Sequence, residues 1–275
     1  MGKKWTDLHL LRDYSQPGSN RQRVRRLFDE IAALALFPST TTFWRGHSVS
    51  SYLLQPSLLR KTVITPAGIR DLLATADRAS LYWRQGILIR DSNEFEKLSV
   101  LQHTGTPTPL IDLTADPLVS LYFAAEKHDN DDGLLIGFNA DDRWIDQTHS
   151  ADTYERLTYR LRSEGQVGWL VPPVISDRVV VQRARLMIAP VADSAHWADQ
   201  ISDVLLPSMP PDWDASKLDA LFNDTGSGRR SMPPVVALTI PKDLKEFIRD
   251  SLATNYGISH ESLFPEPEGF ALKPS

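Results

Sequence analysis

The sequence contains no cysteine, which excludes disulfide bonds, thiol catalysis and thiolate metal sites. The absence is consistent with a cytoplasmic protein, because disulfides accumulate in oxidising compartments. No apolar run is as long as a transmembrane helix, and the first ten residues, MGKKWTDLHL, contain no signal-peptide core. We therefore expect a cytoplasmic location and no membrane association.

Several common catalytic signatures are also missing. The sequence has no GxGxxG or GxxxxGK phosphate loop, no HExxH metal motif and no GxSxG nucleophile motif. Its seven histidines are scattered, so we expect no metal site. The net charge of −5 provides no general basic field for nucleic acid, although a local basic site is compatible with it.

What the sequence does contain is enough apolar material for a substantial core. It has 275 residues, of which 41% are hydrophobic, and seven tryptophans. We interpret residues 1–275 as one α+β domain, with a core over about 40–190 and a C-terminal strand and helix over 234–264. We expect an N-terminal helix over 20–37. We interpret residues 193–231, which are rich in proline, as an irregular insertion or lid.

The chain is organised around residues 101–125, where three local patterns follow one another. Polar residues, glycine and prolines predict an irregular loop at the start. In the strand expected next, Asp112 and Thr114 share a face, because strand side chains alternate. Asp116 and Pro117 then indicate the N-cap and first residue of a helix. Such an order is typical of an anion or ligand cradle. On these residues alone, a well-capped core strand and helix is the more common explanation.

A second distinctive pattern is the Arg-Gly pair at the end of residues 40–47, TTTFWRGH. The β-branched and aromatic content of this stretch predicts a strand. Arg45 needs a partner if it is buried, and Gly46 allows a ligand to approach the backbone. Arg45 therefore serves either a functional role or a structural pairing with an acid such as Asp112.

Apolar spacing predicts the remaining elements. Further helices are expected over 66–86, 152–162, 241–255 and 259–264, with another one capped by residues 91–93 and running to Leu101. Strands are expected over 133–138, 169–175, 178–181, 186–188 and 235–240. Gln182 ends the β-branched run Val179-Val180-Val181, where a polar amide is either a strand-end hydrogen bonder or a site residue.

Together these motifs resemble the FRG domain family. The naming motif is matched by residues 43–47, FWRGH, and the longest block by residues 101–124. Shorter blocks correspond to residues 52–60, 178–182 and 258–269, in the order of the family. The chain departs from the family where Trp44 replaces a usual Phe. It also departs at Thr104, Pro109 and Leu113, which replace a usual aromatic, Arg and Trp, and in lacking a Gly after Gln182.

More distantly, the chain resembles the ADP-ribosyltransferase superfamily. There, a first-strand Arg or His precedes Gly, a hydroxyl-bearing strand leads into a helix, and a later strand carries an acid or amide. The resemblance implies an α+β fold with a split mixed or antiparallel sheet and flanking helices. It also implies NAD as the substrate, without a metal, and an enzyme that acts as a toxin or phage-defence effector.

The resemblance further implies roles for particular residues. The implied catalytic residues are Arg45, Asp112, Thr114, Gln182 and His103. The implied NAD-binding residues are Arg45, Gly46, His47, Gln102, Thr114 and Tyr122. Tyr122 would stack on the nicotinamide ring. Because Gln182 cannot act as a base, Asp112 or His103 would take the proton of the acceptor.

Two other classes of function remain open from the sequence. A non-catalytic module could bind a nucleotide or a partner in the same pocket, and the departures at Pro109 and Leu113 favour it. A nuclease is less favoured, because only Asp112 and Asp116 lie close together around the central stretch. The partners expected are a nucleic-acid or protein acceptor and an antitoxin or other regulatory protein.

Overall fold

The computed structural model describes most of the chain. The described residues are 10–13, 18–35, 41–52, 54–60, 65–80, 93–140, 143–174, 176–188 and 235–265. The insertion predicted over 193–231 lies outside them, as do the ends of two predicted helices, residues 36–37 and 81–86.

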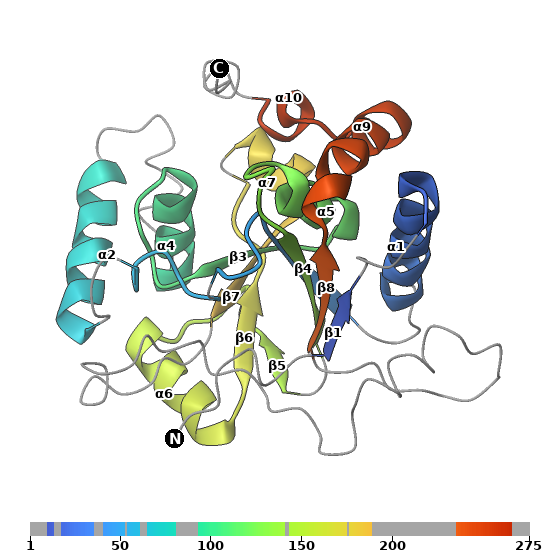
Figure 1. The fold of residues 1–275 in the computed structure, drawn as a ribbon. Helices are drawn as coiled ribbons and strands as arrows, with labels where there is room; N and C mark the ends of the chain where they lie inside the picture. The colour runs from blue at the N-terminus through green and yellow to red at the C-terminus, as the bar shows by residue number, and fades with distance from the viewer. Residues whose placement is uncertain are drawn as a thin grey trace.

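The described strands form one eight-stranded sheet in the order β1-β8-β4-β2-β3-β7-β6-β5 (Figure 1). The strands are β1 Leu10–Asp13, β2 Thr41–His47, β3 Ile111–Thr114, β4 Gly133–Ala140, β5 Trp144–Asp146, β6 Val167–Leu170, β7 Ala184–Ile188 and β8 Val235–Ile240. β1 pairs with β8 and β5 with β6 in parallel, whereas the other neighbours are antiparallel. The α+β class and the mixed sheet are therefore confirmed.

The sheet has its weakest junction between β2 and β3. β2 pairs with β4 from Thr41 to His47, but with β3 only through Trp44 and Thr114. The strands β1-β8-β4-β2 and β3-β7-β6-β5 therefore diverge from this single pair. Both groups nevertheless belong to one hydrogen-bonded sheet.

The helices cover the sheet in two groups that lie apart in Figure 1. They are α1 Asn20–Ala35, α2 Pro66–Ser80, α4 Glu94–His103, α5 Pro117–Ala125, α6 Tyr154–Glu164, α7 Asp177–Val181, α9 Lys245–Tyr256, preceded by the 3-10 turn η3 Lys242–Leu244, and α10 His260–Leu263. α1, α5 and α9 share a core with β2, β4 and β8, which includes Leu27, Trp44 and Ile248. α2, α4 and α6 share another with β6 and β7, which includes Phe95 and Leu186.

The helix ends follow the local signals in the sequence. Asn93 caps α4 in a capping box with Glu96, and Asp116 caps α5 with a proline at the start of the helix. Gly257 ends α9 in the left-handed conformation, with φ of 65°. The helix starts predicted at residues 91–93 and at Asp116 are confirmed, and both position the central stretch.

One strand prediction is wrong, and a second predicted strand differs in its bounds. Residues 178–181 form the helix α7 rather than a strand, and Gln182 is its C-cap. Only Val179 of this run is buried, so the valines have no sheet surface that would favour an extended backbone. The strand predicted over 169–175 is β6, which ends at Leu170, because the following Pro172-Pro173 cannot donate ladder hydrogen bonds.

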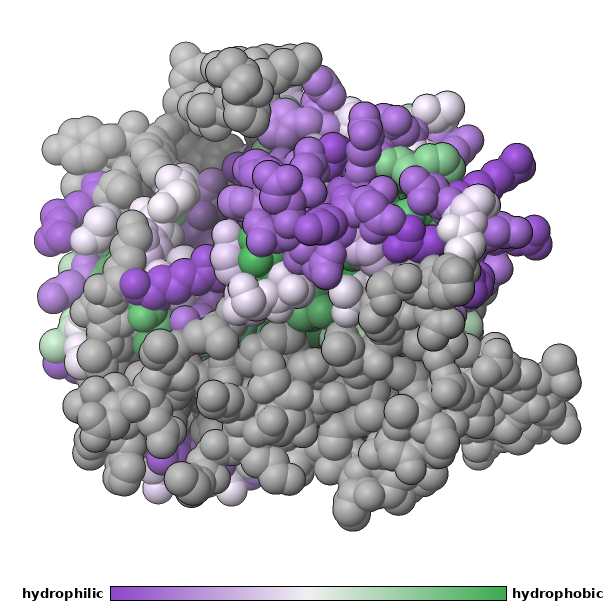
Figure 2. Space-filling model, viewed as in Figure 1, coloured by the Kyte–Doolittle hydropathy of each residue, from purple (hydrophilic) through white to green (hydrophobic). Residues whose placement is uncertain are grey.

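Hydrophilic residues dominate one part of the face shown in Figure 2, over the region where Figure 1 places α9. α9 buries Lys245, Ile248 and Leu252 and exposes charged residues elsewhere, as its amphipathic spacing predicted. None of the helices described is long and apolar enough to cross a membrane.

Candidate functional site

A cleft of about 360 Å³ lies next to the junction of β2 and β3. Eight of the nine residues predicted for the site line it. They are Arg45, Gly46, His47, Gln102, His103, Asp112, Thr114 and Gln182. The structure therefore brings these eight residues together at one cleft, where several of their side chains have contacts that the sequence did not indicate.

Arg45 is held in place by two hydrogen bonds. Its Nε donates to His47 Nε2 at 2.9 Å, since residues 45 and 47 share a face of β2. Its Nη1 donates to the carbonyl oxygen of Asp112 at 2.5 Å. Burial lowers the pKa of Arg45, and the negative charge of Asp112 opposes this shift. Arginine stays protonated in proteins, so a fixed positive charge lies at the cleft.

His47 is a neutral acceptor for Arg45. Burial lowers the pKa of His47 to about 3, and the positive charges of Arg45 and Arg60 act in the same direction. Because Nε2 accepts the hydrogen bond from Arg45, the proton of the neutral ring is on Nδ1. His47 therefore orients the Arg45 guanidinium and carries no charge near pH 7.

The carboxylate of Asp112 ends a chain of polar contacts. Gln102 Nε2 donates to Asp112 Oδ1, and Gln102 Oε1 accepts from the hydroxyl of Thr108. The backbone N–H of Thr108 donates to Ser57 Oγ at 3.1 Å. As predicted, Asp112 lies with Thr114 on the side of β3 that faces the cleft. One hydrogen bond from Gln102 therefore holds the carboxylate, and the contacts behind Gln102 extend to Ser57 in a separate segment of the chain.

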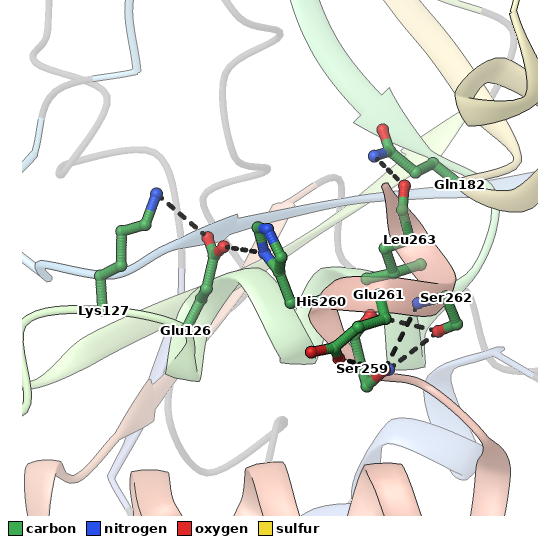
Figure 3. A network of polar contacts seen from close by, with 8 residues as sticks. All are labelled: Glu126, Lys127, Gln182, Ser259, His260, Glu261, Ser262 and Leu263. Atoms are coloured by element: carbon green, nitrogen blue, oxygen red, sulfur yellow. Dashed lines mark hydrogen bonds and ion pairs between the residues drawn. The ribbon is translucent and has the colours of Figure 1, made fainter. Parts of the chain in front are cut away.

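Thr114 and Gln182 mainly hold the backbone around the cleft. Thr114 Oγ1 donates to the carbonyl oxygen of Gln182 at 2.7 Å and accepts from the N–H of Asp116 at 2.9 Å. Gln182 Nε2 donates to the carbonyl oxygen of Leu263 at 2.9 Å (Figure 3). These contacts join β3, the start of α5, the end of α7 and α10.

The structure explains the glycine at position 46 differently from the sequence analysis. A Cβ at this position would lie 2.1 Å from the carbonyl oxygen of Ser120 and 2.6 Å from the N of Ala124. Gly133 meets α5 in the same way, with a Cβ 2.2 Å from the carbonyl oxygen of Ala124. The two glycines let α5 lie close to the sheet, so helix packing rather than ligand approach requires Gly46.

Tyr122, which was predicted to stack on nicotinamide, is not among the residues that line the cleft. Its side chain is 5% exposed and belongs to the core with α1 and α9, where burial raises its pKa. Neighbours on a helix point about 100° apart, and the next residue, Phe123, lines the cleft instead. Phe264 lies against Phe123, with 6.1 Å between ring centroids.

The structure also adds charged residues to the cleft that the sequence did not single out. They are Arg60, Glu126, Lys127 and Arg178. Glu126 Oε1 lies 3.4 Å from His260 Nδ1, and Glu126 Oε2 lies 3.7 Å from Lys127 Nζ (Figure 3). In the sequence, Glu126 is distinguished only as a charged residue directly after the apolar helix α5, which does not by itself predict a place in the cleft.

Residues from the C-terminal segment complete one side of the site. The guanidinium of Arg178 lies 4.7 Å from the centroid of the Phe264 ring, and the His260 ring stacks on the same ring at 4.6 Å. Within the described ranges, no group of three or more His, Asp or Glu residues could hold a metal ion. The site contains four basic side chains, two carboxylates and aromatic rings.

Comparison with protein families confirms one part of the sequence interpretation. Residues 40–133 match the FRG domain, so the chain contains a domain of the family that its motifs indicated. The match spans β2, β3 and α5, and with them Arg45, Gln102 and Asp112. No curated protein and no solved structure matches the chain.

Proposed function

We propose that the protein is an NAD-dependent enzyme of the ADP-ribosyltransferase type and that the cleft binds NAD. The strongest support is the Arg45 guanidinium, which hydrogen bonds to His47 and to the backbone carbonyl of Asp112 hold in place. The Asp112 carboxylate and several aromatic rings line the same cleft. A fixed guanidinium suits a phosphate or ribose, and a carboxylate suits a positively charged transition state. The divergence of β2 from β3 supports the split-sheet fold of this superfamily.

The reaction would break the bond between the nicotinamide nitrogen and the ribose. The electron pair of that bond leaves with nicotinamide, and an acceptor oxygen or nitrogen forms the new bond to the ribose carbon. Asp112 would stabilise the oxocarbenium-like state and accept the proton of the acceptor, and His103 is the alternative base. Glu126 supplies a second carboxylate in the same cleft. Phe123 or Phe264 would take the stacking role first assigned to Tyr122.

The biological setting expected for such an enzyme is that of a toxin or phage-defence effector in the cytoplasm. Its acceptor would be a nucleic acid or a protein, and an antitoxin or other regulatory protein would restrain it. The chain has a net charge of −5, so an acceptor nucleic acid would bind through the cleft rather than through a general basic surface.

A second candidate function is a non-catalytic module that binds a nucleotide or a partner. Two of the groups expected to act on the substrate, the hydroxyl of Thr114 and the amide nitrogen of Gln182, already bond to the backbone. Leu113, which replaces the usual tryptophan, also lines the cleft. Tight nucleotide binding without turnover would identify this function.

The test is nicotinamide release from NAD by the purified protein, with and without cell lysate as the source of acceptor. We expect release by the native protein and a loss of about 100-fold or more in Arg45→Ala, because the variant lacks the fixed cation. The matched control is Arg25→Gln, on the solvent face of α1, where the Arg25 side chain is 84% exposed. Release that survives unchanged in both Arg45→Ala and Gln182→Ala would overturn the proposal.

A further inference from the structure

The cleft is positively charged although the whole chain is acidic. Its lining includes four basic residues and two acidic ones, a difference of +2 when histidines are left aside, whereas the chain carries −5. The basic residues are Arg45, Arg60, Lys127 and Arg178, and the acidic ones are Asp112 and Glu126. A local excess of cations in an acidic protein indicates an anionic ligand.

The four basic residues differ in the contacts that their side chains already make within the protein. Lys127 faces Glu126, Arg178 lies over the Phe264 ring, and Arg45 bonds to His47 and to the Asp112 backbone. Among the residues that the structure describes, no hydrogen bond or ion pair holds the guanidinium of Arg60. Its five N–H donors are therefore available to a ligand in the cleft.

Arg60 and Arg45 line the same cleft, so their two charges act on each other. Burial is the main cause of the lowered pKa of Arg45 and of His47, and the charge of Arg60 acts in the same direction. Asp112, one of the two acids that line the cleft, already accepts a hydrogen bond from Gln102 at Oδ1. Two guanidinium groups that repel each other at one cleft are stabilised when an anion binds between them.

We propose that Arg60 and Arg45 together form a diphosphate subsite, which selects ligands that carry a nucleoside diphosphate. Each planar guanidinium can donate two parallel hydrogen bonds to one phosphoryl group, so two of them match a diphosphate better than a monophosphate. This inference rests on the proposed nucleotide function for the nucleoside part of the ligand. The diphosphate part rests on the two arginines alone.

The test compares the calorimetric dissociation constants of ADP-ribose, ADP, AMP and adenosine, with inorganic pyrophosphate as a probe that lacks the nucleoside. We expect ADP to bind more tightly than AMP. In Arg60→Gln, we expect the dissociation constants of ADP and pyrophosphate to rise about 10-fold or more, and that of adenosine to stay unchanged. Arg60→Lys keeps the charge but loses the two parallel N–H donors of the guanidinium. We expect this variant to bind ADP and pyrophosphate more tightly than Arg60→Gln and less tightly than the native protein.

Arg156→Gln is the control, because it removes an arginine that is 82% exposed on α6.

Failure of the enzyme function and failure of the subsite give different results. Pyrophosphate binding that is lost in Arg60→Gln supports the subsite even if NAD is never turned over. NAD turnover combined with equal ADP affinity in Arg60→Gln and the native protein overturns the subsite alone. A native protein that binds neither ADP nor pyrophosphate also overturns it.

Discussion

At the scale of single residues, the pair of Arg45 and His47 determines the chemistry of the cleft. Both side chains extend from the same face of β2, and the neutral ring of His47 accepts the Nε–H of Arg45. Burial and two nearby arginines keep this ring uncharged. The guanidinium is therefore oriented without being neutralised, and its charge remains available to a ligand.

The low pKa of His47 makes the protein less stable in acid. In the unfolded chain this histidine titrates near 6.5, whereas in the folded protein its pKa is about 3. Between these values the unfolded state binds the proton and the folded state does not, so stability falls as the pH decreases. The expected contribution is up to about 1.4 kcal/mol per pH unit below pH 6. Urea unfolding at pH 7, 6 and 5 measures it.

His47→Gln keeps an acceptor for Arg45 but removes the titrating ring, so the variant should show a shallower slope of unfolding free energy with pH. The control is His149→Gln, at an exposed position, which should leave the slope close to that of the native protein. Equal slopes for native protein and His47→Gln would contradict the assignment of this linkage to His47.

At the scale of elements, the position of α5 depends on contacts at its face and at both of its ends. Gly46 and Gly133 allow the helix to lie against β2 and β4. At the start of α5, the hydroxyl of Thr114 accepts a hydrogen bond from the backbone N–H of the N-cap residue Asp116. At the other end, Arg249 of α9 donates to the carbonyl oxygen of Ala125 at 2.6 Å. α5 brings Phe123 and Glu126 to the cleft, so these contacts determine the shape of the site.

Lys245 joins three elements at the same end of α5. Its side chain is buried, and Nζ donates to the carbonyl oxygens of Ser48, Lys127 and His128 at 2.7, 2.8 and 2.8 Å. Lys245→Met would leave these three carbonyl groups without this donor. We expect the variant to lose about 3–5 kcal/mol of unfolding free energy, measured by urea denaturation.

The matched control is Lys242→Met, three residues earlier, where the lysine is exposed and its backbone N–H donates to Asp132. Within the described ranges, no hydrogen bond or ion pair involves the Lys242 side chain. This variant should stay within about 0.5 kcal/mol of the native protein. A loss of the same size in both variants would show that lysine removal in this segment, rather than the three buried hydrogen bonds, causes the effect.

At the scale of the whole molecule, the cleft gathers residues that are far apart in the chain. Its lining runs from Trp44 on β2 to Phe264 after α10, and Gln182 and Leu263, 81 positions apart, are joined by one hydrogen bond. A ligand in this cleft contacts both halves of the sheet and the C-terminal segment. Its binding energy therefore adds to the stability of the whole fold.

ADP-ribose at about 100 times its dissociation constant should stabilise the folded protein by about 2.7 kcal/mol. For a domain of this size, the expected rise in melting temperature is roughly 5–10 °C, measured by differential scanning fluorimetry. At the same ligand concentration Arg60→Gln should show a smaller rise, and Arg156→Gln the full one. An unchanged melting temperature despite calorimetric binding would indicate that the ligand binds a locally unfolding part of the chain.

The FRG motifs are visible in the sequence, and the α+β class and most of the helices and strands could be predicted from it. It also determined the ends of α4, α5 and α9, because capping residues, proline and glycine act within a few positions of the backbone. The shared face of Asp112 and Thr114 followed from strand alternation alone. These properties are local, so the residues that carry them are visible without a fold.

Which side chains reach the cleft depends on tertiary packing and could not be predicted from the sequence. Val179 to Val181 became helical because no strand partner faces them, and Tyr122 entered the core while Phe123 turned to the cleft. Arg60 and Glu126 joined the site from separate segments. These outcomes depend on how α5, α7 and α10 pack on the sheet, which involves contacts between residues far apart in sequence that no local pattern encodes.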